Sequence, residues 1–171
     1  MRRRERCSFC ILYSVLCILY SPWYSTFPTL YSSMARKIFD QLVARFGFPE
    51  ALFRSCALVD HEDDVFMTTP EAEAFERIKV VRKGIRLVRV FVHGIKPTTN
   101  AMQLFGRYAT RNVIDLDIVQ AREFMQGTTL ELSAPVEEGF VIVRHDGFGL
   151  GVGLYRQGIL RSQVPLSRRT R

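Results

Sequence analysis

Near its C-terminal end the chain places glycine at every second position, at Gly147, Gly149, Gly151 and Gly153. An apolar run over 140–143 precedes these glycines. Because side chains alternate between the two faces of a strand, glycine at period two leaves one face bare. A bare face lets another backbone or a ligand approach closely. The pattern therefore predicts a bent strand within a compact β unit.

These glycines do not have the context of a nucleotide-binding loop. A dinucleotide-binding turn needs a strand before it and a helix after it, so that the helix N-terminus faces the phosphates. Residues 152–158 are instead β-like and carry no helical apolar period. The chain also has no Gly-Lys-Ser/Thr sequence of the P-loop type. We expect a packed strand, and close approach of a nucleic-acid backbone is compatible with it.

The first 33 residues differ from the rest of the chain. A basic stretch, Arg2–Arg6, precedes the apolar stretch Cys7–Tyr20, which is shorter than the roughly 20 residues that a membrane span needs. No A-x-A-like cleavage site follows, and Met34 opens directly into a helical pattern. Three interpretations stay open for residues 1–33: a translated upstream segment with Met34 as the true start, which we favour, a signal peptide, or an interfacial anchor.

The charge of the chain favours polyanionic partners. Its 171 residues carry a formal net charge of +7. Residues 1–33 hold four arginines against one glutamate, a net +3, so the body over 34–171 carries the remaining +4. Two basic groups can be either a solvated face or a nucleic-acid surface. They are Lys79, Arg82, Lys83, Arg86 and Arg89, and Arg161, Arg168, Arg169 and Arg171.

Cysteine usage and the remaining polar clusters indicate neither an enzyme nor a metal protein. Three of the four cysteines lie in the first 33 residues, and Cys56 is the single thiol of the body. This usage fits a reducing, cytoplasmic compartment, and Cys56 has no evident activating partner. The acidic run 61–64 is typical of a solvated hairpin tip, because its spacing is not that of an EF-hand loop. We expect no catalytic residue, no metal and no cofactor.

Hydrophobic periodicity along the body predicts an α+β fold. Asp117 and Gln120 have the spacing of a capping box, and Thr98 or Thr99 is expected to cap the preceding helix. The expected helices cover 35–46, 71–77, 100–108 and 118–125, with a short segment over 48–53. The expected strands cover 57–59, 65–67, 79–92, 112–116, 130–132 and 140–143, followed by the glycine-rich β unit.

Six segments in order carry a resemblance to a known family. They are Lys96-Pro97-Thr98, Asn112-Val113-Ile114-Asp115-Leu116, Phe124-Met125-Gln126-Gly127, Gly139-Phe140-Val141-Ile142-Val143, Gly149-Leu150-Gly151-Val152-Gly153 and Leu160-Arg161-Ser162-Gln163-Val164-Pro165. Together they resemble a PUA-type domain. More closely, they resemble the C-terminal RNA-binding region of the NOL/NOP/Sun RNA cytosine-5 methyltransferases, the bacterial 16S ribosomal RNA methyltransferase F type. The resemblance covers roughly residues 38–169.

Two departures from this family qualify what the resemblance implies. The family carries a basic residue just after the closing proline, where this chain has Leu166, and we expect Arg168 and Arg169 to substitute for it. The sequence also offers neither a glycine-rich turn for S-adenosylmethionine nor a Pro-Cys catalytic segment. The resemblance therefore implies a non-catalytic RNA-binding domain over 34–171, a small PUA-like mixed β-barrel with flanking short helices and a helical lead-in.

The resemblance and the charge pattern together predict which residues contact RNA. The phosphate contacts are expected from Lys96, Arg144, Arg156, Arg161, Arg168 and Arg169. Gly149 and Gly151 are expected to permit close approach of the RNA. Phe148 and Tyr155 are candidates for stacking on bases, although aromatic residues in such strands are more often core.

The expected partner is a structured RNA, ribosomal or transfer RNA, in an rRNA-processing role. An alternative is an accessory subunit that supplies RNA affinity to a separate rRNA methyltransferase through its helical face. Exposure of Ile38, Leu42 and Phe46 would favour this alternative, because unpartnered apolar patches mark interfaces. Membrane association is expected only if residues 7–20 are retained.

Overall fold

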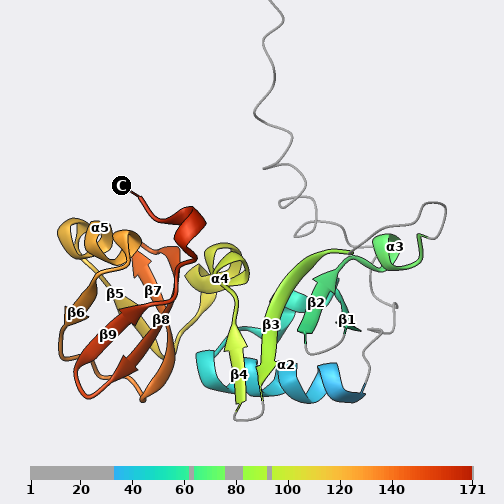
Figure 1. Cartoon of the computed structure of the whole chain (residues 1–171). Coiled ribbons are helices and arrows are strands. Elements are labelled where there is room, and N and C mark those ends of the chain that lie inside the picture. The colour runs from blue at the N-terminus through green and yellow to red at the C-terminus, as the bar shows by residue number, and fades with distance from the viewer. Residues whose placement is uncertain (1–32, 62–63, 76–82, 92–93, 171) are drawn as a thin grey trace, which may run out of the picture.

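A computed structural model describes residues 33–61, 64–75, 83–91 and 94–170 (Figure 1). The three interpretations of the leader concern residues outside these ranges, apart from Ser33. Within the described ranges, no helix combines the length and the apolar character that crossing a membrane requires.

The described residues form two β-sheets and several helices, which confirms the predicted α+β class. The helices are α2 (Ser33–Phe46), α3 (Pro70–Glu73), α4 (Thr99–Phe105) and α5 (Ile118–Gln126), with 3-10 turns η1 (Glu50–Phe53), η2 (Gly106–Tyr108) and η3 (Leu166–Arg168). The strands are β1 (Ala57–His61), β2 (Asp64–Thr68), β3 (Ile85–Phe91), β4 (Gly94–Pro97), β5 (Val113–Asp115), β6 (Thr129–Glu131), β7 (Gly139–His145), β8 (Phe148–Arg156) and β9 (Ile159–Ser162).

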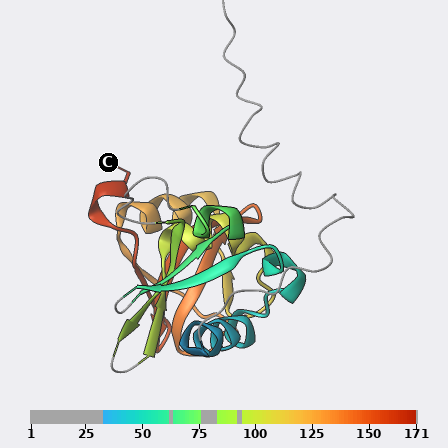
Figure 2. The ribbon, with the colours of Figure 1, turned by 90° about the vertical axis from the view of Figure 1, so that its right-hand side faces the viewer.

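The first sheet is antiparallel, with the strand order β1-β2-β3-β4. Helix α2 lies beneath it in both views of the ribbon (Figures 1 and 2). Ile38, Leu42 and Phe46 repeat at helical spacing and bury their side chains in the core between the helix and the sheet. These three residues therefore do not form the exposed apolar face that would have favoured the accessory-subunit alternative.

The second sheet has the order β5-β7-β8-β9-β6, in which β5 runs parallel to β7 and the other neighbours are antiparallel. Among the described strands this sheet is open rather than the closed barrel that the sequence led us to expect, because its two edge strands do not pair. Helix α5 connects those edge strands, and its Ala121 and Phe124 pack in the core on one face of the sheet.

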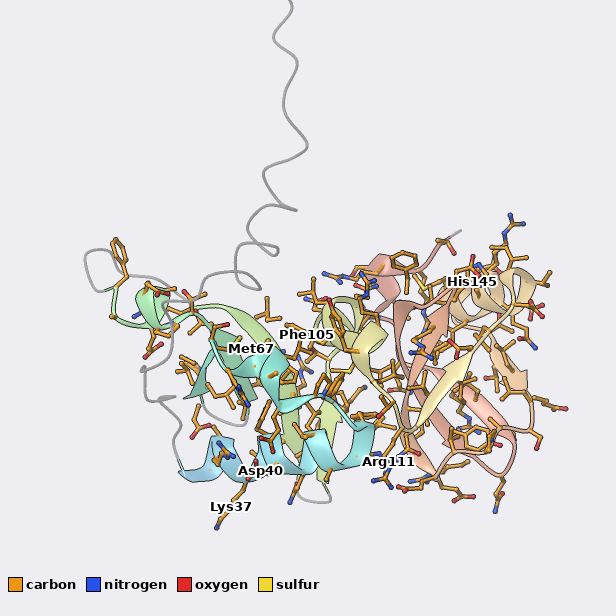
Figure 3. The ribbon with its side chains drawn as sticks, turned by 180° about the vertical axis from the view of Figure 1, so that it is seen from behind. Lys37, Asp40, Met67, Phe105, Arg111 and His145 are labelled. Carbon is orange, nitrogen blue, oxygen red and sulfur yellow. The ribbon has the colours of Figure 1, made fainter. Side chains whose placement is uncertain are left out.

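Helix α4 joins the two sheets through a shared core. Its Ala101 and Met102 are completely buried together with Leu87 of β3 and with Ile142 and Val152 of the second sheet. Seen from behind, Met67 of β2 and Phe105 at the end of α4 lie in the middle part of the molecule (Figure 3). Each face of the second sheet is thus covered, one by α4 and the other by α5.

The C-terminal end of α2 is capped by the segment that leads into β5. The last carbonyls of a helix have no intrahelical partners. Here Arg111 Nη1 donates to the carbonyl of Ala44 at 3.3 Å, and Asn112 Nδ2 donates to that of Arg45 at 2.9 Å. The backbone N–H groups of Thr110 and Arg111 both donate to the carbonyl of Phe46 at 3.0 Å. Figure 3 shows Arg111 beside this end of α2.

The Arg45 side chain at the end of α2 also contacts the second sheet. Its guanidinium donates to the carbonyl oxygens of Glu138 and Phe140 at 3.0 Å each and to the carboxylate of Glu137 at 3.2 Å. Since Asn112 Oδ1 accepts from the backbone N–H of Glu137 at 2.9 Å, the loop before β7 is held by both residues. These contacts fix the orientation of α2 against the second sheet.

Several local predictions are confirmed and two change in extent. The capping box of Asp117 and Gln120 is present, and Thr98 rather than Thr99 caps α4. The helix expected over 100–108 ends at Phe105 and continues as a 3-10 turn. The helix expected over 71–77 ends at Glu73. Residues 76–82, which include the start of the strand expected over 79–92, lie outside the described ranges, and β3 forms Ile85–Phe91 of that strand.

We predict that Asn112→Ala lowers the free energy of unfolding by about 2–4 kcal/mol, because the carbonyl of Arg45 and the N–H of Glu137 lose their partners. Asn112 also has a positive φ of 51°, which alanine tolerates less well. Urea denaturation measures the change. Asn100→Ala, at an exposed position of α4, is the control, and equal stability of both variants contradicts the capping role of Asn112.

Candidate functional site

The period-two glycines of β8 are covered by the chain itself. A β-bulge between Val143 and Arg144 shifts the pairing of β7 with β8, so the glycines meet different neighbours. A Cβ on Gly149 would lie 2.2 Å from the carbonyl oxygen of Met102 in α4. A Cβ on Gly151 would lie 3.0 Å from Thr99 Cγ2 and one on Gly153 would lie 2.5 Å from Leu160 Cδ1.

This packing places α4 against Gly149 and Gly151, where the sequence led us to expect close approach of RNA. Glycine has no side chain, so the backbone of α4 can pack directly against the backbone of β8. Sequence reasoning identified the bare strand surface but not the element that would cover it. The space above these two glycines is filled by α4.

Tyr155, a predicted RNA contact, belongs to the core. It is only 7% exposed, and its hydroxyl accepts from the N–H of Ala134 at 3.2 Å and lies 3.3 Å from the carbonyl oxygen of Leu132, to which it donates. Because the ring is buried and both hydrogen-bonding functions of the hydroxyl are used, Tyr155 has no face available for stacking on a base. Burial of this kind is common for aromatic residues in strands.

Arg144 is committed to an ion pair within the chain. Its Nε and Nη2 donate to the two carboxylate oxygens of Asp115 at 2.9 and 2.8 Å, and its Nη1 donates to the carbonyl of Ala109 at 3.3 Å. The side chain is 19% exposed. A bidentate arginine–carboxylate pair uses the donors that a phosphate would need, so Arg144 joins β7 to β5 rather than facing a ligand.

The other predicted arginines are at the surface but not at one place. Arg156 and Arg161 are exposed, whereas Arg168 donates to Gln103 Oε1 at 3.3 Å and Arg169 donates to the carbonyl of Val164 at 3.3 Å. Arg156 ends β8 and shares a shallow pocket with Glu138. At about 3.3 Å per residue, it lies about 26 Å along the strand from Phe148, which begins β8.

Lys96 lies where the two sheets meet. It is half-buried on β4, and its Nζ donates to Gln163 Oε1 at 2.7 Å. The same nitrogen is 5.8 Å from the ring centroid of Phe140. Burial lowers the pKa of Lys96 from its usual value, and the nearby charge of Arg89 lowers this pKa further.

An exposed group of two aromatic rings and one arginine lies at the start of β8. The guanidinium carbon of Arg107 is 5.4 Å from the ring centroid of Tyr108 and 5.7 Å from that of Phe148. Phe148 is 64% exposed and Tyr108 is 37% exposed. We call Arg107, Tyr108 and Phe148 the aromatic–arginine platform. Exposed rings and guanidinium planes of this kind are surfaces on which unpaired bases stack.

Helix α4 extends this platform toward the C-terminal turn. Gln103 lies one helical turn before Arg107, its Nε2 donates to the carbonyl of Leu150 at 3.0 Å, and its Oε1 accepts from Arg168. A hydrogen-bonded path therefore connects the start of β8 with η3. Of the predicted contacts, Arg168 is brought to this surface together with Phe148.

Arg107 and Tyr108 were missed by sequence reasoning. The pattern that points to them is a basic residue followed by an aromatic one at the end of an amphipathic helix. The sequence predicts that this pair lies in the last turn of a helix and faces solvent. Its proximity to Phe148, 40 positions later, depends on the packing of α4 on β8.

Two observations bear on groups that could take part in catalysis. Burial raises the pKa of the Cys56 thiol, with a smaller opposing effect from a hydrogen bond with Ser55. A nucleophilic cysteine has the opposite shift. Over the described ranges, no group of three or more histidine, cysteine, aspartate or glutamate side chains has a geometry that could hold a metal ion.

Comparison with known proteins identifies relatives of the C-terminal part. Residues 111–170 match the family described as the methyltransferase RsmF PUA domain. The chain is 32% identical over 89 residues to the ribosomal RNA small subunit methyltransferase F of Aeromonas salmonicida, a match that covers 52% of this chain and 19% of the relative. It is 30% identical over 114 residues to the protein of the same name from Shewanella putrefaciens, covering 63% and 24%. The chain thus spans about a fifth to a quarter of the length of these curated relatives.

We predict that Gly149→Ala lowers the free energy of unfolding by about 3 kcal/mol, because the new methyl group meets the backbone of α4. Gly147→Ala is the matched control. No atom lies within 4 Å of the added Cβ there, and the φ of +76° predicts a loss of about 1 kcal/mol. Thermal denaturation measures both. A Gly149→Ala protein as stable as the control contradicts the packing role of this glycine.

Proposed function

Because residues 111–170 match the family of RsmF methyltransferase PUA domains, we propose that this chain is an RNA-binding module that itself catalyses no reaction. Its partner is a structured ribosomal or transfer RNA, and its place of action is the cytoplasm. Residues 34–171 act together as the RNA-binding body. The relatives are named as ribosomal RNA methyltransferases, which favours a role connected with rRNA processing.

The observation that carries this proposal is the aromatic–arginine platform. Large exposed aromatic rings cost free energy in water, and two of them here flank one arginine at the surface. Single-stranded or looped bases have apolar faces that stack on such rings, and a guanidinium both stacks on a base and attracts phosphate. The platform therefore suits a structured RNA with an unpaired segment.

The surface charge supports the same partner. Arg168 adjoins the platform through Gln103, and the body carries a net +4. Arg156, Arg161 and Arg169 add positive charge elsewhere on the second sheet and its C-terminal segment. Since each phosphate neutralised by a cation releases counterions, binding should weaken as salt concentration rises.

We predict that Phe148→Ala weakens binding of a fluorescent RNA hairpin by about 1–3 kcal/mol, the usual value of one stacked base. Arg107→Gln weakens it as well and reduces its salt dependence. Fluorescence anisotropy at two salt concentrations measures both effects.

Phe75→Ala and Arg122→Gln are the matched controls for these variants. Phe75 is 44% exposed near α3, and Arg122 is exposed on α5, at opposite ends of the molecule from one another (Figure 1). Neither substitution should change affinity. Loss of binding in the controls to the same extent, or a wild-type chain that ignores the RNA at low salt, overturns the proposed function.

The lengths of the relatives favour a second candidate role, that of an accessory subunit for a separate methyltransferase. They carry the matched region as a fifth to a quarter of a longer methyltransferase chain. In this role the module supplies RNA affinity to a separate catalytic chain. We predict that adding it to an RsmF-type methyltransferase truncated before its PUA domain increases methyl transfer to ribosomal RNA. An unchanged rate of methyl transfer, at concentrations where the module binds RNA, rejects this role.

A further inference from the structure

The first sheet places two cations directly opposite each other on neighbouring strands. Arg89 of β3 pairs in register with Lys96 of β4, and their backbone positions face across the ladder. Like charges in this arrangement destabilise a sheet. Arg89 is 54% exposed, whereas Lys96 is half-buried. An unfavourable pair of this kind calls for a compensating negative charge.

The described residues supply only part of that compensation. Asp64 of β2 lies 2.8 Å from Arg86 Nε but 3.9 Å from Arg89 Nε, so its carboxylate mainly serves Arg86. Among the described residues, Asp64 pairs with Arg86 and lies in register with Arg89, whereas Lys96 forms no ion pair with a carboxylate. The hydrogen-bond partner of Lys96 is the neutral amide of Gln163, and an amide cannot cancel its charge.

A further cation, Arg161, lies on the face of the second sheet that Lys96 contacts. Phe140, Leu154 and Arg161 lie in one cross-strand row on β7, β8 and β9, because Phe140 is in register with Leu154 and Leu154 with Arg161. Residues in register point to the same face of a sheet. Lys96 Nζ lies 5.8 Å from the Phe140 ring at one end of this row. Arg161 at the other end is exposed, with β4 beside this sheet in Figure 1.

We propose that Arg89, Lys96 and Arg161 form a phosphate-binding site at the junction of the two sheets, and that its ligand is a phosphodiester of the RNA backbone. This inference rests on the proposed function and deepens it, because it separates phosphate binding at the junction from base stacking at the aromatic–arginine platform. Phosphate oxygens accept hydrogen bonds from guanidinium and ammonium groups, and a bound phosphate relieves the repulsion between Arg89 and Lys96. The first sheet, which lies outside the family match at 111–170, thereby takes part in binding.

The test uses the full chain with Arg89→Gln and Lys96→Met, and with Arg122→Gln as the control. Fluorescent structured RNA is titrated over a series of salt concentrations. Each junction variant should bind several-fold more weakly at low salt, and the slope of log affinity against log salt should fall by about one. The slope of the control should match that of the wild type.

A stability measurement separates binding from a structural role. Without RNA, Arg89→Gln should unfold at the same or a higher temperature than the wild type, because the cross-strand repulsion is gone. Inorganic phosphate should raise the unfolding temperature of the wild type more than that of Arg89→Gln. If Arg89→Gln is less stable than the wild type, then Arg89 stabilises the fold by pairing with Asp64, and the proposed phosphate site is overturned.

The outcomes distinguish this inference from the proposed function. Wild-type binding of RNA with an unchanged salt slope in both junction variants overturns the junction site alone. A wild-type chain that binds no RNA overturns the proposed function. If inorganic phosphate then still stabilises the wild type selectively, the ligand is free phosphate, and the phosphodiester assignment is overturned as well.

Discussion

The capping of α2 by residues 110–112 is the contact on which the arrangement of the two sheets depends. The last turn of α2 ends with carbonyl groups that no residue of the helix can satisfy. The segment leading into β5 supplies their donors from side chains and backbone, and Arg45 returns hydrogen bonds to the loop before β7. Because buried unpaired carbonyls are costly, neither sheet can rotate away from the other without loss of several hydrogen bonds.

The fixed orientation of the sheets determines where surface remains for a ligand. Helix α4 fills the space above Gly149 and buries Met102 against both sheets. Gln103 of α4 and Arg107 of the following turn η2 stay at the surface, and Arg107 lies beside Phe148. The same arrangement brings Lys96 within 2.7 Å of Gln163, although these residues are 67 positions apart. Helix α4 therefore lies between the buried glycine side of β8 and the exposed surface that carries the aromatic–arginine platform.

Predictions based on local sequence were the most successful. The helix over 35–46, the capping box at Asp117 and the strand at 140–143 each depend on residues within a few positions of one another, and all are present. Two residues of the predicted site make internal contacts that the sequence did not indicate, because Arg144 is paired with Asp115 and Tyr155 is buried. Both outcomes depend on residues more than 20 positions away. A charge or a ring in the sequence does not reveal whether a distant partner already uses it.

The sequence by itself determined the α+β class, the order of the elements, the basic character of the body and the likeness of its C-terminal segments to a PUA-type domain. These properties follow from periodicity, capping residues and composition, which are local or additive along the chain. Only the tertiary structure decided that the second sheet stays open, that α4 rather than a ligand covers Gly149, and that Arg107 meets Phe148. The physical reason is that burial and pairing are properties of two surfaces in contact, and a strand pattern specifies only one of them.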